Sequence, residues 1–161
     1  MPGPGEDPER PRAARPQPHP LDLAWIRLGD GWSWIAVVPA EADVDVAKVG
    51  STLCTIGEAL TSRRVTFVDA GRITTQDEAA RLLTELRRQR EDPAEGRIVS
   101  LPSVLRNPGA LEVARAADGV VLCARRGTAP LAAVRETIAR VEAHRVVLAL
   151  LLDEAGAAVP S

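Results

Sequence analysis

The sequence contains no tyrosine, only one lysine (Lys48), and no glycine between residues 39 and 49. Without tyrosine, the chain cannot phosphorylate itself on that residue. Its 20 basic and 22 acidic residues are interspersed and give a formal net charge of −2. No basic field is therefore present that would favour nucleic acid or an anionic membrane as a partner.

Long apolar runs are missing as well. The longest, Val146–Leu152, is too short to cross a bilayer, so we expect no transmembrane segment. The first residues, MPGPGEDPER, lack the apolar region of a signal peptide, which favours a cytoplasmic protein. Cys54 and Cys123 lie inside apolar stretches, which predicts two buried free thiols, with the disulfide of a secreted domain as the alternative.

Proline is concentrated at the N-terminus. Its density over residues 1–20 removes amide donors and disfavours helix, which predicts a disordered or polyproline-like tail. A PxxP-like stretch that docks onto a partner is the less favoured alternative. The folded domain is expected over residues 21–153, followed by a short C-terminal tail at residues 154–161.

Apolar segments alternate with helical patterns along the predicted domain. The runs VTFVD, GVVLCA and VVLALLL are nearly continuous, as in strands that are buried on both faces of a parallel sheet. Strands that alternate with helices form right-handed βαβ units. We predict an α/β domain of three layers, a parallel sheet of about five strands with helices on both faces. The expected strands are Trp34–Val38, Val65–Asp69, Arg97–Leu101, Gly119–Ala124 and Val146–Leu152.

The expected helices have recognisable ends. Thr75 and Glu78 have the spacing of a capping box, and Pro108 suits the first position of a helix. Three tryptophans, Trp25, Trp32 and Trp34, cluster around the first strand, where we expect core packing; an interface role is the alternative. The helices are expected over about Asp43–Ser62, Thr75–Arg90, Asn107–Ala117 and Pro130–Ala143.

The turn after the first strand, residues 39–48, occupies the place where nucleotide-binding proteins carry a glycine-rich phosphate loop. Such a loop needs glycines so that backbone N–H groups can surround the phosphates, and a lysine to neutralise their charge. This turn instead carries Asp43 and Asp45. At ~4 Å and an effective dielectric constant near 20, each carboxylate would repel a phosphate by about 4 kcal/mol. We therefore expect ATP and magnesium binding in the usual manner to be lost.

Several segments carry a family pattern. They are VTFVDAG at residues 65–71, Leu101–Ser103, Gly109–Ala110, Ala114–Gly119, Arg125, Gly127–Thr128 and Asp153. In these segments, which fall within residues 31–153, the chain resembles the bacterial tyrosine kinases of capsule and exopolysaccharide synthesis, which belong to the MinD/ParA-like group of P-loop ATPases. The resemblance implies a P-loop NTPase-like fold and assigns Asp69 to the aspartate that serves the family's metal and catalytic machinery.

The departures from this family fall on its chemistry. Where the family loop resembles S-A-x-P-G-E-G-K-T-T, this chain reads PAEADVDVAK. Lys48 falls two places late, a rotation of roughly 200° on a helix. Ser100 replaces the aspartate that ends the third strand, and the tyrosine-rich tail is absent. The two glycines, the lysine and the magnesium-binding threonine are replaced by Asp43, Asp45, Val46 and Ala47.

These observations predict a catalytically inactive domain that acts as an interaction or regulatory module, in exopolysaccharide or capsule biosynthesis or with a MinD/ParA-type partner. The expected partner is a protein, either a second copy or an active relative. The alternative is a divergent nucleotide hydrolase or phosphotransferase that uses Asp69. A receiver-like domain with Asp69 as acceptor, and a cation held by three aspartates, are less favoured. The residual site candidates are Asp69, Ser100, Arg125 and Arg126, of which the arginines follow the fourth strand at the edge where such folds bind ligands.

Overall fold

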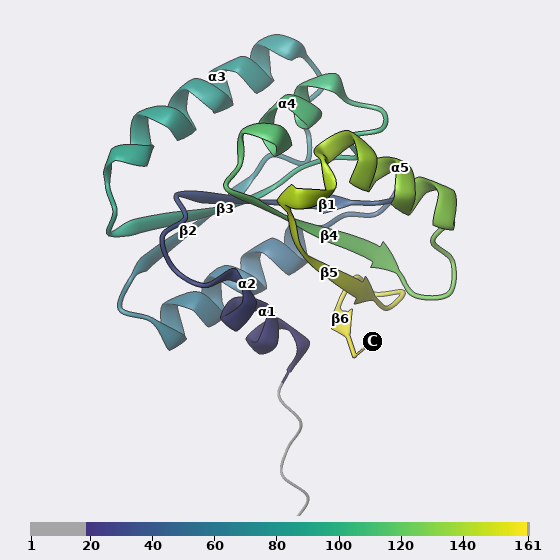
Figure 1. Ribbon diagram of the computed structural model, residues 1–161, viewed down its shortest axis with the longest axis horizontal. Helices are drawn as coiled ribbons and strands as arrows, with labels where there is room; N and C mark the ends of the chain where they lie inside the picture. Colours follow the sequence, from purple (N-terminus) through teal and green to yellow (C-terminus); the bar gives the residue numbers. More distant parts are fainter. Residues whose placement is uncertain (1–18, 161) are drawn as a thin grey trace, which may run out of the picture.

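The computed structural model describes residues 19–160, which form a six-stranded sheet and five α-helices (Figure 1). The strand order is β2-β3-β1-β4-β5-β6; the first five strands run parallel and β6 runs antiparallel to β5. The strands are β1 (Trp34–Pro39), β2 (Arg64–Asp69), β3 (Glu95–Ser100), β4 (Gly119–Arg125), β5 (Val146–Leu152) and β6 (Ala158–Val159). The helices are α1 (Pro20–Leu28), α2 (Ala47–Leu60), α3 (Gln76–Arg88), α4 (Pro108–Ala116) and α5 (Leu131–Val141), with 3₁₀ turns at Gln89–Glu91 and Ala143–Arg145.

The sheet forms the middle of three layers. Helices α1 and α2 cover one face, and α3, α4 and α5 cover the other (Figure 1). Every residue of β1 is buried, as expected for a central strand with apolar layers on both sides. The predicted α/β class, the parallel sheet and the helices on both faces are confirmed, with one additional antiparallel strand.

Both ends of the domain differ from the prediction. Helix α1 begins at Pro20, whose missing N–H costs nothing at a first helical position, and the His19 ring accepts a hydrogen bond from the Leu21 amide at 3.2 Å. Residues 1–18 of the predicted tail lie outside the described residues. At the other end, a turn with Gly156 in the left-handed region (φ 77°) returns the chain, so that Ala158–Val159 adds a strand inside the predicted C-terminal tail.

Helix α2 begins four residues later than predicted. The expected start at Asp43 is wrong; residues 40–46 form a loop, and the first helical residue is Ala47. Aspartates compete for backbone amides in non-helical conformations, which favours a loop or a cap at this place. Val44 and Val46 are buried within this loop and hold it against the core.

The amino end of the sheet is held by two arginine–tryptophan stacks. The Arg63 guanidinium lies 4.6 Å from the Trp32 ring centroid, and that of Arg90 lies 5.7 Å from the Trp34 ring centroid. Arg63 also donates to the carbonyl oxygens of Trp32 and Glu95. Trp32 and Trp34 belong to the cores on opposite faces, so both sides of the sheet are clamped at this end.

Asp118 completes this arrangement. Its Oδ2 accepts hydrogen bonds from the amides of Ser33 (2.6 Å) and Trp34 (3.1 Å), and its Oδ1 pairs with Arg90 at 2.8 Å. The start of β1 is thereby fixed to the start of β4. Trp25 packs edge-on to Trp32, with ring centroids 5.7 Å apart, and all three tryptophans are buried, which confirms the expected core packing.

Candidate functional site

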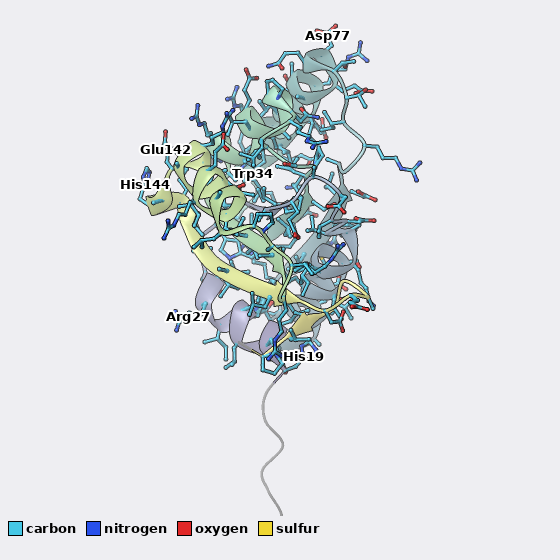
Figure 2. The ribbon with its side chains drawn as sticks, turned by 90° about the vertical axis from the view of Figure 1, so that its right-hand side faces the viewer. His19, Arg27, Trp34, Asp77, Glu142 and His144 are labelled. Atoms are coloured by element: carbon cyan, nitrogen blue, oxygen red, sulfur yellow. The ribbon has the colours of Figure 1, made fainter. Side chains whose placement is uncertain are left out.

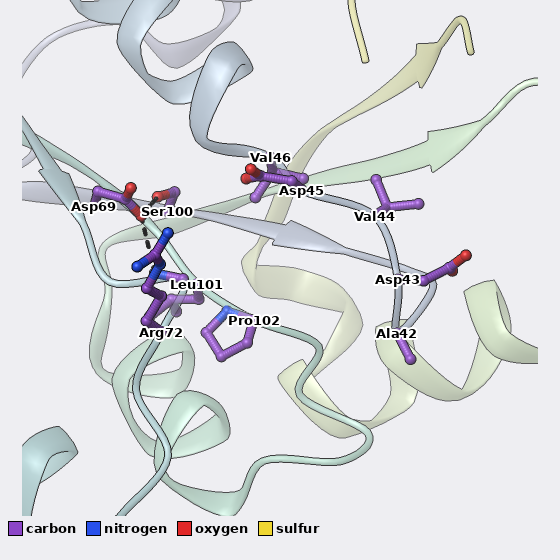
Figure 3. Close-up of a pocket in the computed structure, with 11 residues that line it drawn as sticks. Ala42, Asp43, Val44, Asp45, Val46, Asp69, Arg72, Ser100, Leu101 and Pro102 are labelled. Atoms are coloured by element: carbon purple, nitrogen blue, oxygen red, sulfur yellow. Dashed lines mark hydrogen bonds between the residues drawn. The ribbon is translucent and has the colours of Figure 1, made fainter. Parts of the chain in front are cut away.

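A hollow of ≈ 310 Å³ lies at the carboxyl end of the sheet, between the loop after β1 and the ends of β2 and β3 (Figure 3). Ligands of open parallel sheets bind outside this end of the strands. The volume is at the lower limit for a small-molecule site. Its lining residues are Ala42, Asp43, Val44, Asp45, Val46, Asp69, Gly71, Arg72, Ser100, Leu101 and Pro102.

The loop over residues 40–46 is held to β4 as well as to the core. The Ala40 amide donates to the carbonyl of Cys123 at 2.8 Å, and the Arg125 amide donates to the Glu41 carboxylate at 3.3 Å. With Val44 and Val46 buried, the loop is anchored at several points along its length. The loop is thus anchored by buried valine side chains and by a carboxylate of the chain itself. A phosphate loop would offer free amides in this place.

The two aspartates of this loop have different positions. Oδ1 of Asp45 accepts a hydrogen bond from the Ala47 amide, the first of α2, at 2.8 Å; the N-cap residue itself is Val46, whose side chain makes no capping bond. Asp43 is 80% exposed at its side chain and lies 4.0 Å from the guanidinium of Arg125. Figure 3 shows the Asp45 carboxylate directed towards Asp69 and that of Asp43 directed away. Asp45 therefore binds the first amide of α2, whereas Asp43 makes only the long contact with Arg125.

Asp69 and Ser100 come together, as neighbouring ends of two paired strands. Oδ1 of Asp69 accepts from the Gly71 amide at 3.0 Å and from the Ser100 hydroxyl at 3.1 Å. Ser100 is buried, whereas Asp69 is exposed to the hollow. The side chain of Arg72, which the sequence reasoning missed, lies on the same side of the hollow (Figure 3). Asp69 thus performs the structural role of capping the turn after β2.

Arg125 and Arg126 lie elsewhere. Arg125 lines a second hollow of ≈ 430 Å³ together with Glu41, Arg106 and Thr128. Arg126 is exposed, and its amide donates to the carbonyl of Leu152 at 2.8 Å. The candidates predicted from the sequence are therefore divided between two places. The missed residues Arg72 and Arg106 follow the carboxyl ends of β2 and β3, so the rule for parallel sheets would have pointed to them.

No group of three or more histidine, cysteine, aspartate or glutamate side chains in residues 19–160 is placed to hold a metal ion. Cys54 and Cys123 are free and buried, as predicted. Burial raises the pKa of both thiols to about 12, so neither is a nucleophile at neutral pH.

Within residues 19–160, no helix has the length and apolar character needed to span a membrane. No model of a known protein family matches the sequence, and no curated protein matches it at a significant level.

Proposed function

We propose that this chain is a catalytically inactive, P-loop-ATPase-like domain that acts as an interaction or regulatory module. The succession of β1, a loop and α2 at the carboxyl end of a parallel sheet supports the P-loop-like assignment, because phosphate loops connect a strand to a helix in this way. The family resemblance over residues 31–153 supports it as well. The proposal then turns on what has replaced the phosphate-binding groups.

The proposed loss of nucleotide binding rests on one hydrogen bond at the start of α2. The Asp45 carboxylate accepts from the Ala47 amide at 2.8 Å, at the start of α2. In a phosphate loop, amides at this point bind the phosphate oxygens, and the positive end of the helix dipole favours their charge. Here an internal carboxylate takes that place. A phosphate would have to displace it and expose its negative charge.

The charge of the hollow also disfavours nucleotide binding. Asp45 and Asp69 face it together with Arg72, whereas the Asp43 carboxylate is directed away and lies 4.0 Å from Arg125. Lys48 is two positions past the family's lysine, and residue 46 is a buried valine. A triphosphate would meet more negative than positive charge at close range, which repels it even with water between the groups.

The regulatory role follows from a scaffold that is retained without its phosphate site. A protein partner is the remaining use for such a domain: a second copy, or an active relative in exopolysaccharide or capsule biosynthesis, or a MinD/ParA-type ATPase. Affinity purification of the full chain from its native host, with identification of the bound proteins, tests this part. Recovery of such an ATPase supports the proposal, and recovery of small-molecule metabolic enzymes alone contradicts it.

Isothermal titration of Mg-ATP into the full chain tests the loss of nucleotide binding. We expect no heat of binding beyond dilution. Magnesium-dependent binding in the micromolar range would overturn the proposal. The Asp45→Asn variant provides a matched control, since an amide oxygen can still accept from the Ala47 amide while the negative charge is removed.

Asp69 supports a second candidate, a nucleotide hydrolase or phosphotransferase, because it is exposed to the hollow beside Arg72. Against this candidate, Oδ1 of Asp69 already accepts two hydrogen bonds that serve the fold.

A further inference from the structure

The outer edge of β5 is largely open. Strand β6 pairs only with Leu151 and Leu152, so Val146–Leu150 has no neighbouring strand on its outer side among residues 19–160. In the same register, the next residue of β6 after Val159 is Pro160, which has no amide hydrogen with which to continue the ladder. Figure 2 looks onto this side of the molecule, where β5 crosses the front beginning near His144. The open segment offers unpaired backbone groups to a further strand.

The devices that protect this edge lie at its two ends, a bulge at the start of β5 and the two-residue β6 followed by Pro160, and none lies between them. Val146–Leu150 reads VVLAL and contains no charge and no proline, although a bulge lies at its start beside Val120 and Val121. The opposite edge of the sheet, β2, carries Arg64 and Asp69 at its two ends, both exposed. Proteins protect edge strands with such charges. Arg145 and Asp153 flank β5 in a similar way, so both edges have charges at their ends and neither has one within the strand.

The surface beside the open edge is apolar. A groove of ≈ 720 Å³ runs between α1 and β5, and Arg27 is its only charged lining residue. Leu23 on α1 is 49% exposed, and Val147 on β5 is 39% exposed. Strand pairing at this edge would therefore bury aliphatic side chains as well as backbone groups, which is the main favourable contribution in association.

We propose that the occupant of this edge is a second copy of the chain, whose residues 146–150 pair antiparallel with the same residues about a two-fold axis. An antiparallel pair is self-complementary, since the same segment supplies donors and acceptors on both sides. The segment carries no charge that would select an oppositely charged partner or repel its own copy. The net charge of −2 on each whole chain adds only weak repulsion.

This inference rests on the proposed function in one respect, because it names the partner and the surface of the interaction module. It differs from association across the nucleotide face, because the open edge of β5 and the hollow beside Asp45 and Asp69 share no lining residue. A dimer formed through β5 leaves that hollow free for another protein. The sheets of the two copies would join into one continuous sheet.

Sedimentation equilibrium of the full chain, over a micromolar concentration series without nucleotide, tests the inference. We expect a mass approaching twice 17.1 kDa. The double variant Val147→Lys/Ala149→Lys places charges on exposed positions of the edge and should weaken dimerisation about tenfold or more. Leu60→Lys is the matched control, because Leu60 is 57% exposed on α2, away from β5, and should leave the dimer unchanged.

Cross-linking provides a second measurement that needs no charged variant. Val147→Cys should be joined to its copy by a short bismaleimide, whereas Leu60→Cys should not, and buried Cys54 and Cys123 should not react. A monomer throughout the series, or a dimer that forms equally well in the double variant, overturns the inference and leaves the proposed function intact. A dimer that appears only with Mg-ATP overturns both.

Discussion

The Ser100 hydroxyl donates a hydrogen bond to Oδ1 of Asp69 at 3.1 Å and thereby ties the carboxyl end of β3 to that of β2. The same oxygen accepts from the Gly71 amide, so one carboxylate oxygen holds two strands and the following turn. In an enzyme of the resembled family this aspartate would be available to a metal ion. In this chain the visible use of Asp69 is structural.

The first prediction separates structure from catalysis at Asp69. Asp69→Ala should lower the free energy of unfolding by about 1 kcal/mol, since two hydrogen bonds lose their acceptor. Asp69→Asn should retain most of the stability, because its amide oxygen can still accept. Phosphate release from ATP, measured beside urea unfolding, should remain at background in all three proteins. Release by the wild type that both substitutions abolish would favour the hydrolase instead.

The second prediction concerns the start of α2. Asp45→Ala removes the acceptor for the Ala47 amide and should cost about 1 kcal/mol of stability, the usual net contribution of one hydrogen bond. Asp43→Ala should change stability by less than about 0.5 kcal/mol, because Asp43 is exposed and its ion pair with Arg125 is long, at 4.0 Å. Thermal unfolding of the two variants measures the difference. Equal effects would show that the hydrogen bond between Asp45 and the Ala47 amide adds no stability.

The third prediction tests the packing of α1 on α2. A Cβ atom at Gly57 would overlap the indole ring of Trp25. Gly57→Ala should therefore destabilise the protein by about 1–3 kcal/mol, although the same change within a helix normally stabilises by about 1 kcal/mol. Exposed Thr55→Ala on the same helix should be nearly neutral.

A double-mutant cycle identifies the cause of this effect. In a Trp25→Leu background, the cost of Gly57→Ala should fall, because the smaller side chain leaves room for the methyl group. Urea unfolding gives the four free energies. An unchanged cost would mean that the indole ring is not the obstacle.

The fourth prediction gives a pH dependence to the capping box of α3. The amides of Thr74 and Thr75 donate to the Glu78 carboxylate at 2.8 and 3.1 Å, which lowers the pKa of Glu78 below its ordinary value of 4.5. Because the folded pKa lies below the unfolded one, the stabilisation is present above pH 4.5 and is lost as pH falls through the lowered pKa. The melting temperature of Glu78→Gln should thus lie below that of the wild type at about pH 7 and approach it at about pH 3. A difference that stays constant with pH would contradict this account.

The fifth prediction concerns the thiols. Burial raises the pKa of Cys54 and Cys123 to about 12, so the native protein should react very slowly with a disulfide reagent at mildly alkaline pH. In denaturant both thiols should react rapidly, and the reagent should detect two thiols per chain. A fast native reaction would show that one of them reaches solvent.

The sequence predicted the fold better than the site. Continuous apolar runs identified the parallel strands, and Thr75 and Pro108 marked the starts of α3 and α4 because caps depend on local chemistry. The start of α2 was placed too early, since periodic valines continue into the loop and are buried there. Strand β6 was missed because a strand of two residues is too short to show an alternating apolar pattern. Only its pairing with β5 defines it.

The candidate site could not be predicted from local sequence patterns alone, because it depends on which strands are neighbours in the sheet. Asp69 and Ser100 were named from their strand ends, yet their hydrogen bond depends on β2 and β3 being neighbours. Arg125 and Arg126 were grouped because they are adjacent in sequence, but successive residues leaving a strand point in different directions. Arg125 lines a hollow, whereas Arg126 is exposed.

The clamp at the amino end of the sheet bears on how this chain can change. Arg63, Arg90 and Asp118 secure the start of β1 at the end opposite to the loop over residues 40–46. Substitutions in that loop should therefore leave in place the contacts that secure the start of β1. Such a domain can lose one binding chemistry and acquire another without first losing its shape.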